Sequence, residues 1–124
     1  MSSSNIPTDE DFKRAEAADA ERNRGLSDVS SSILRRFGGN DVHEVFMFFS
    51  PRKDVFGAFI FFRMDEQIRA AEKSGLSSQI KNAVVEELER VGRGNRDTIK
   101  VDFEFDSHEN VEANFEGDYY LRLR

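Results

Sequence analysis

The sequence feature that most constrains the fold is a pair of phenylalanine-rich segments, residues 42–49 and 55–63. A short polar stretch with one proline, residues 50–54, separates them. Two apolar segments joined in this way are typical of an antiparallel β-hairpin. Seven of the twelve phenylalanines of the chain lie in this predicted hairpin: Phe46, Phe48, Phe49, Phe56, Phe59, Phe61 and Phe62.

Both faces of this hairpin are apolar, because successive side chains of a strand point to opposite faces. Burying one phenylalanine is worth roughly 1.5–3 kcal/mol, so three or four left in water would cost as much as a domain's net stability. One face must meet helices, and the other needs a second cover. That cover is the N-terminal helix or the C-terminal connection, a second copy or docked partner, or a small apolar ligand. The candidate apolar interface consists of Phe46, Phe48, Phe59 and Phe61.

Two segments carry apolar residues at the spacing of a helix that buries one face. The first follows Gly25, ends at residues 38–40, and has the stripe Leu26, Val29, Ile33 and Phe37. The second begins at Ser77 or Ser78, runs to about Arg90, and has the stripe Leu76, Ile80, Val84, Leu88 and Val91. Between hairpin and second helix, residues 65–73 predict a short helix that begins at Asp65.

The closing stretch, residues 99–124, alternates apolar and charged residues and predicts strands. We expect a third strand over 98–106, a connection with a helical turn capped by Ser107, and a fourth strand over 118–124. One side of this half of the sheet should meet solvent. If the two strands pair antiparallel, Arg122 and Arg124 can form cross-strand pairs with the acids of the third.

The predicted fold is an α+β two-layer sandwich with the element order α-β-β-α-β-β. It has an antiparallel sheet of about four strands and helices on one face. At 124 residues, one domain over 8–124 is expected, after a disordered lead over 1–7. Residues 8–25 favour an exposed helix capped by Thr8, with few large apolar side chains to bury.

The charge of the chain is acidic and locally one-sided. The formal net charge is −6, and Asp102 to Asp118 holds seven acids and no Lys or Arg. Such a chain lacks the clustered cations that nucleic-acid binding needs, and it suits a basic protein partner. The longest apolar run, 55–62, is far below the roughly 20 residues of a membrane span. Without cysteine, the chain fits a reducing cytosol, although a periplasmic protein without cysteine would look the same. We expect a soluble cytoplasmic protein.

The sequence offers no convincing catalytic or metal site. Asp106, Ser107 and His108 have the composition of a catalytic triad, but adjacent side chains cannot form its linear chain of hydrogen bonds. Ser107 is better read as a helix cap. His108 with Asp106, Glu109 and Glu112 could hold a divalent metal, but the stretch lacks the spacing of an EF-hand and is better read as a solvated acidic loop.

A G-x-G within residues 92–96 follows a helix rather than a strand and lacks the third glycine of a dinucleotide site, so it predicts a helix stop and turn. We therefore expect no enzyme, no cofactor and no metal.

Element order, size, acidity and lack of catalytic residues resemble the small immunity proteins that bacteria carry against polymorphic or contact-dependent toxins. The resemblance implies a stoichiometric protein inhibitor whose acidic surface covers a basic toxin active site. The partner contacts it implies are Asp102, Glu104, Asp106, Glu109 and Glu112. The alternatives are a structural or regulatory homodimer that associates through the phenylalanine-rich hairpin and a module that binds a small apolar ligand.

Overall fold

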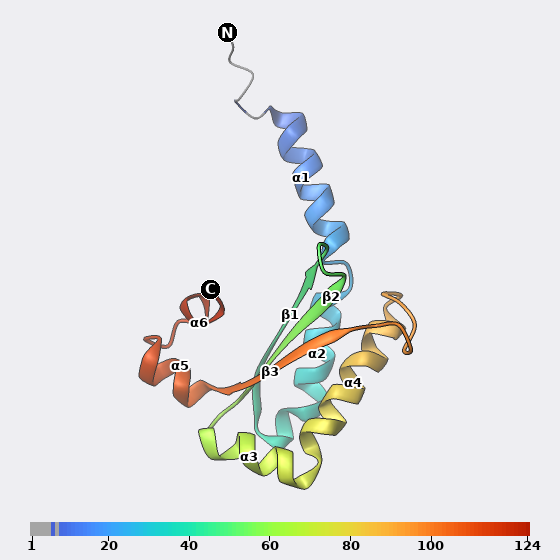
Figure 1. The fold of residues 1–124 in the computed structure, drawn as a ribbon. Helices are drawn as coiled ribbons and strands as arrows, with labels where there is room; N and C mark the ends of the chain where they lie inside the picture. The colour runs from blue at the N-terminus through green and yellow to red at the C-terminus, as the bar shows by residue number, and fades with distance from the viewer. Residues whose placement is uncertain (1–5, 7) are drawn as a thin grey trace.

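A computed structural model describes Ile6 and residues 8–124 (Figure 1). The predicted disordered lead, residues 1–7, lies outside the described residues except for Ile6. The elements are α1 (Asp9–Arg22), α2 (Leu26–Phe37), the 3-10 turn η2 (Gly38–Asn40), β1 (Val42–Ser50), β2 (Val55–Phe62), α3 (Asp65–Ser74), α4 (Leu76–Arg90), β3 (Val101–Ser107), α5 (His108–Asn114) and α6 (Tyr119–Leu123).

The sheet has three strands in the order β1-β2-β3, with β2 in the centre. β1 and β2 form the predicted antiparallel hairpin, but β3 lies parallel to β2. The prediction of a four-stranded antiparallel sheet is therefore wrong. The reason is the connection: α3 and α4 carry the chain back along the sheet, and such a helical crossover delivers the next strand in parallel orientation.

The predicted fourth strand, residues 118–124, is the short helix α6. Asp118 caps this helix, because its side chain accepts a hydrogen bond from the backbone N–H of Tyr120 at 2.8 Å. Tyr119 and Leu123 stand four residues apart, which brings them to one side of a helix as readily as to one side of a strand. The alternation of apolar residues was therefore ambiguous over so short a segment.

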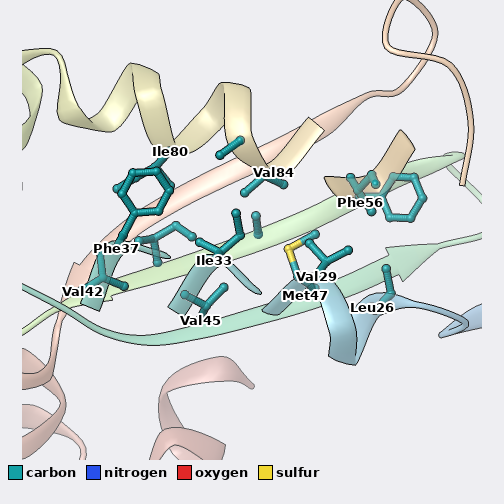
Figure 2. Close-up of a cluster of buried hydrophobic side chains, with 14 of the residues drawn as sticks. Leu26, Val29, Ile33, Phe37, Val42, Val45, Met47, Phe56, Ile80 and Val84 are labelled. Atoms are coloured by element: carbon teal, nitrogen blue, oxygen red, sulfur yellow. The ribbon is translucent and has the colours of Figure 1, made fainter. Parts of the chain in front are cut away.

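Helices α2 and α4 cover one face of the sheet and form the core with it (Figures 1 and 2). The predicted stripe of α2 is fully confirmed, since all four of its residues are buried. In α4, Ile80, Val84 and Leu88 are buried, and Leu76 and Val91 pack at the margin. The sheet contributes to this core Val42, Val45, Met47, Phe56, Ala58, Ile60 and Phe62.

The second face of the sheet is covered in part by the C-terminal helices α5 and α6, which lie across the sheet from α2 and α4 (Figure 1). Phe61 points to this face and has no exposed surface. The Tyr119 ring stands 4.9 Å from the Phe61 ring and 5.3 Å from the Phe46 ring, measured between centroids. The prediction of helices on one face is thus wrong, and part of the second face is covered within the same chain.

A shift of register lies between Val42 and Glu44 at the start of β1, as in a β-bulge. Val42 therefore joins the core beside Val45, although simple alternation places it with Phe46. The bulge also leaves His43 on the side of the C-terminal helices, beside His108.

Helix α1 extends away from the rest of the molecule (Figure 1) and has no buried residue, as predicted. Thr8 caps it in a reciprocal pair of bonds with Asp11. None of the helices within residues 8–124 has the length and apolar character needed to cross a membrane.

Replacing Ile33 by alanine tests the packing of α2 on the sheet. Ile33 has no exposed surface, and alanine keeps the helix while leaving a cavity, so the free energy of unfolding should fall by about 2–5 kcal/mol. Chemical denaturation measures this change. Ser31→Ala, on the exposed side of the same helix, is the control and should change stability by less than about 0.5 kcal/mol. Equal effects of the two variants would contradict this packing.

Candidate functional site

Arg122 joins the C-terminal helices to the sheet. Its Nε donates to Asp106 Oδ2 and its Nη2 to Glu104 Oε1, each at 2.5 Å. The guanidinium also lies over two rings of β2, 6.0 Å from the Phe59 centroid and 5.9 Å from the Phe61 centroid. The predicted pairing of Arg122 with the acids of the third strand is therefore present, although it comes from a helix and not from an antiparallel strand.

These bonds keep a charge beside an apolar surface. Burial alone would lower the pKa of Arg122, but the hydrogen bonds that it donates to Asp106 and Glu104 outweigh burial, so the pKa is raised. Because two carboxylates share one guanidinium, the trio keeps a net negative charge. Of the two carboxylates, Glu104 faces solvent and Asp106 is largely buried.

Asp106 also fixes the junction between β3 and α5. Its Oδ1 accepts the backbone N–H of Ser107 at 2.8 Å and the Nδ2 of Asn110 at 3.1 Å. Ser107 caps α5, as predicted: its Oγ accepts the Asn110 backbone N–H at 3.0 Å and donates to the Asp65 carboxylate. The triad composition of residues 106–108 is therefore structural, because both the acid and the serine are buried in backbone caps.

The two histidines of the chain meet at the other end of this C-terminal cover. The rings of His43 and His108 lie 4.3 Å apart between centroids. His108 Nδ1 lies 2.7 Å from the Tyr119 hydroxyl, and its Nε2 lies 2.8 Å from Glu112 Oε1. This arrangement fits an imidazole that accepts from tyrosine and donates to the carboxylate. The pKa of Tyr119 is raised to about 12, mainly by burial, so its hydroxyl stays a donor.

A hollow of about 530 Å³ opens beside the histidines, lined by His43, Arg63, Met64, His108, Glu109, Glu112 and Ala113. Both ring nitrogens of His108 have partners within the chain, the Tyr119 hydroxyl and the Glu112 carboxylate. Among the residues that the structure describes, no three His, Asp or Glu side chains gather as metal ligands. The hollow combines the cation of Arg63, the carboxylates of Glu109 and Glu112, and the exposed Met64.

The residues of the predicted apolar interface divide into two pairs. Phe59 and Phe61 lie beneath Arg122, and Phe61 is fully buried. Phe48 remains 44% exposed, beside Phe46 at the rim of the C-terminal cover. Here a hollow of about 240 Å³ is lined by Phe46, Phe48, Tyr119, Tyr120 and Leu123.

The five predicted partner-binding acids form a band along β3 and α5. Asp102 and Glu104 are exposed on β3, and Asp106 is buried between them and α5. On α5, Glu109 accepts the backbone N–H of Asp65 at 2.9 Å, and Glu112 accepts from His108. Both α5 acids remain exposed. Four of the five predicted acids are thus accessible from solvent.

Sequence reasoning missed His43, Tyr119 and the Arg122 position above the phenylalanine rings. The one local signal for their arrangement was Asp118. An aspartate is a favourable N-cap, and here it begins the helix that carries Tyr119 and Arg122. The His43–His108 contact depends on the bulge in β1 and on the parallel placement of β3, and neither is visible locally.

Comparison of the chain with protein-family models, with curated proteins and with solved structures finds no match.

Replacing Arg122 by glutamine removes the only cation paired with Asp106 among the described residues. The largely buried carboxylate loses its charge partner, so the free energy of unfolding should fall by roughly 2–4 kcal/mol. Denaturant titration measures the change, and Arg124→Gln is the matched control, because Arg124 is exposed. Equal stability of the two variants would mean that Arg122 does not hold the C-terminal cover in place.

Stability should also depend on pH through His43. Burial of the ring, and secondarily the neighbouring His108, lower the pKa of His43 below its ordinary value near 6.5. The unfolded chain therefore binds the proton more readily. The stabilisation is complete above the ordinary pKa and is lost as the pH falls through the lower pKa of the folded state. Denaturation midpoints between about pH 7.5 and pH 5 should decline, and less in His43→Gln. An equal decline in both proteins would contradict this assignment.

Proposed function

We propose that the protein acts by binding another protein, as an immunity-type inhibitor that covers a basic surface of its partner. The observation that carries this proposal is the acidic band on β3 and α5. Seven acids and two arginines lie between Asp102 and Arg124. One of these arginines, Arg122, is already paired inside the molecule.

The band is held on a rigid frame, which favours a docking role. β3 is bonded to the central strand along its whole length, from the Phe56–Val101 pair to the Phe62–Ser107 pair. Glu109 is oriented by its bond to the α3 backbone and Glu112 by His108. Carboxylates that are already positioned lose little conformational entropy when a partner binds.

The proposed contacts are Asp102, Glu104, Glu109 and Glu112. Asp106 supports them as a positioning residue, since it is largely buried and holds Arg122 and Asn110. Like charges at this density repel one another, and a basic partner relieves that repulsion. Such surfaces also speed the encounter between partners, so binding should weaken with salt.

The test is capture of binding proteins from cells that naturally make this chain, followed by affinity measurement with the captured protein. The variant carries Asp102→Asn, Glu109→Gln and Glu112→Gln, changes that keep the shape of each side chain. Affinity should fall at least about tenfold, and wild-type affinity should fall as salt rises from about 50 to about 300 mM.

A matched control removes the same charge elsewhere: Glu66→Gln, Glu72→Gln and Asp97→Asn are all exposed positions outside the band. The control should keep wild-type affinity within about twofold. If no basic protein is captured, or if both triple variants lose affinity equally, the proposal is wrong.

A further inference from the structure

We infer that the free edge of β1 joins two copies of this chain, so that two three-stranded sheets continue into one across a two-fold axis. This inference concerns a surface separate from the acidic band, because β1 and β3 lie at opposite edges of the sheet.

The two edges of the sheet differ in their protection. Native proteins keep exposed edge strands from pairing by placing charged residues or proline on them. β3 follows this rule, with Asp102, Glu104 and Asp106 at alternate positions. β1 does not: its segment 45–50 has neither charge nor proline, and no strand of the described chain pairs with its outer side. An unprotected apolar edge of this length needs a cover.

Space for that cover exists beside the edge. A hollow of about 370 Å³ is lined by residues of β1 and by residues in the first half of α2 or just before it: Asn23, Leu26, Ser27, Ser30, Ser31, Val45, Phe46, Met47 and Phe48. Its helix wall is made mostly of serine, so a neighbouring strand and helix can approach closely without a charged side chain in the way. Phe48 lines this hollow and also the hollow under Tyr119 and Tyr120.

A second copy of the chain fits this edge better than the basic partner proposed above. Each copy carries a net charge of −6, so two copies repel each other least where an uncharged surface meets its own copy, and 45–50 with the serines of α2 is such a surface. A basic protein, in contrast, gains nothing electrostatically there.

The strand is also complementary to itself. A two-fold axis perpendicular to the sheet keeps each face of the joined sheet continuous. Because directly opposite residues of an antiparallel pair point to the same face, the axis must pass midway between one residue and the same residue of the second copy. With the axis at Met47, Phe46 of one copy lies opposite Phe48 of the second copy on the same face. Aromatic cross-strand pairs of this kind stabilise antiparallel sheets. Because Ser27, Ser30 and Ser31 line the hollow beside this edge, the same symmetry brings them to face the second copy.

The experiment is sedimentation equilibrium of the full chain from about 1 to about 200 μM, a range that brackets micromolar dissociation constants. We expect a dimer. Phe48→Lys places on the edge a lysine, the residue with which many proteins protect their edge strands. This change should raise the dissociation constant of the dimer at least about tenfold. Ser27→Lys, at an exposed position of α2, should do the same by setting two like charges together. If circular dichroism shows that the Phe48→Lys variant does not fold, the dissociation constant of the Ser27→Lys variant tests the inference instead.

Phe12→Lys is the matched control, because Phe12 is 58% exposed on α1 and lines none of these hollows. It should leave the dissociation constant unchanged. Backbone amides of β1 should also exchange more slowly at high than at low protein concentration. A monomer throughout the range, or a dimer that neither edge variant weakens, overturns the inference. Because the test uses only this chain, its result is independent of whether a basic partner is ever captured.

Discussion

Strands β1 and β2 carry phenylalanine on both faces, so the hairpin needs a cover on each side, and the rest of the structure supplies them. On one side the cover is conventional: α2 and α4 present their apolar stripes to the sheet. On the other side it is made of few residues. Tyr119 packs on Phe46 and Phe61, and Arg122 lies over Phe59 and Phe61. The second cover thus combines an aromatic contact with an ion pair.

The second cover explains why acids stand beside phenylalanines on the same face of the sheet. Arg122 can lie over the rings only because Glu104 and Asp106 offset the cost of removing its charge from water. Asp106 in turn organises the start of α5 through Ser107 and Asn110. Acids that could serve a partner and acids that hold the fold together therefore belong to one continuous arrangement on β3 and α5.

Local patterns predicted much of this fold, and long-range geometry accounts for the rest. The α2 stripe and the cap at Ser107 could be predicted because each depends on residues within a few positions. The orientation of β3 depends on the crossover through two helices. The alternation of apolar and polar residues along a strand does not specify its orientation. The alternation of Tyr119, Leu121 and Leu123 predicts a strand over 118–124. The Asp118 cap and the four-residue spacing of Tyr119 and Leu123 favour the observed helix instead.

The acids of residues 102–112 could be listed from the sequence, but not their arrangement. Asp102, Glu104, Glu109 and Glu112 are exposed on β3 and α5, whereas the sequence could not show that Asp106 turns inward to meet Arg122. Nor could it show that the bulge in β1 brings His43 to His108.

The parallel pairing of β2 with β3 has a kinetic consequence. β1 and β2 are joined by a short turn and can pair early, whereas β3 is separated from β2 by the whole of α3 and α4, and contacts so distant in sequence form more slowly. During that interval the central strand has an open edge and apolar side chains on both faces. Its sequence from Val55 to Phe62 is uncharged throughout, the kind of segment that self-associates when exposed. The speed with which β3 docks on β2 therefore sets how long the nascent fold stays open to aggregation.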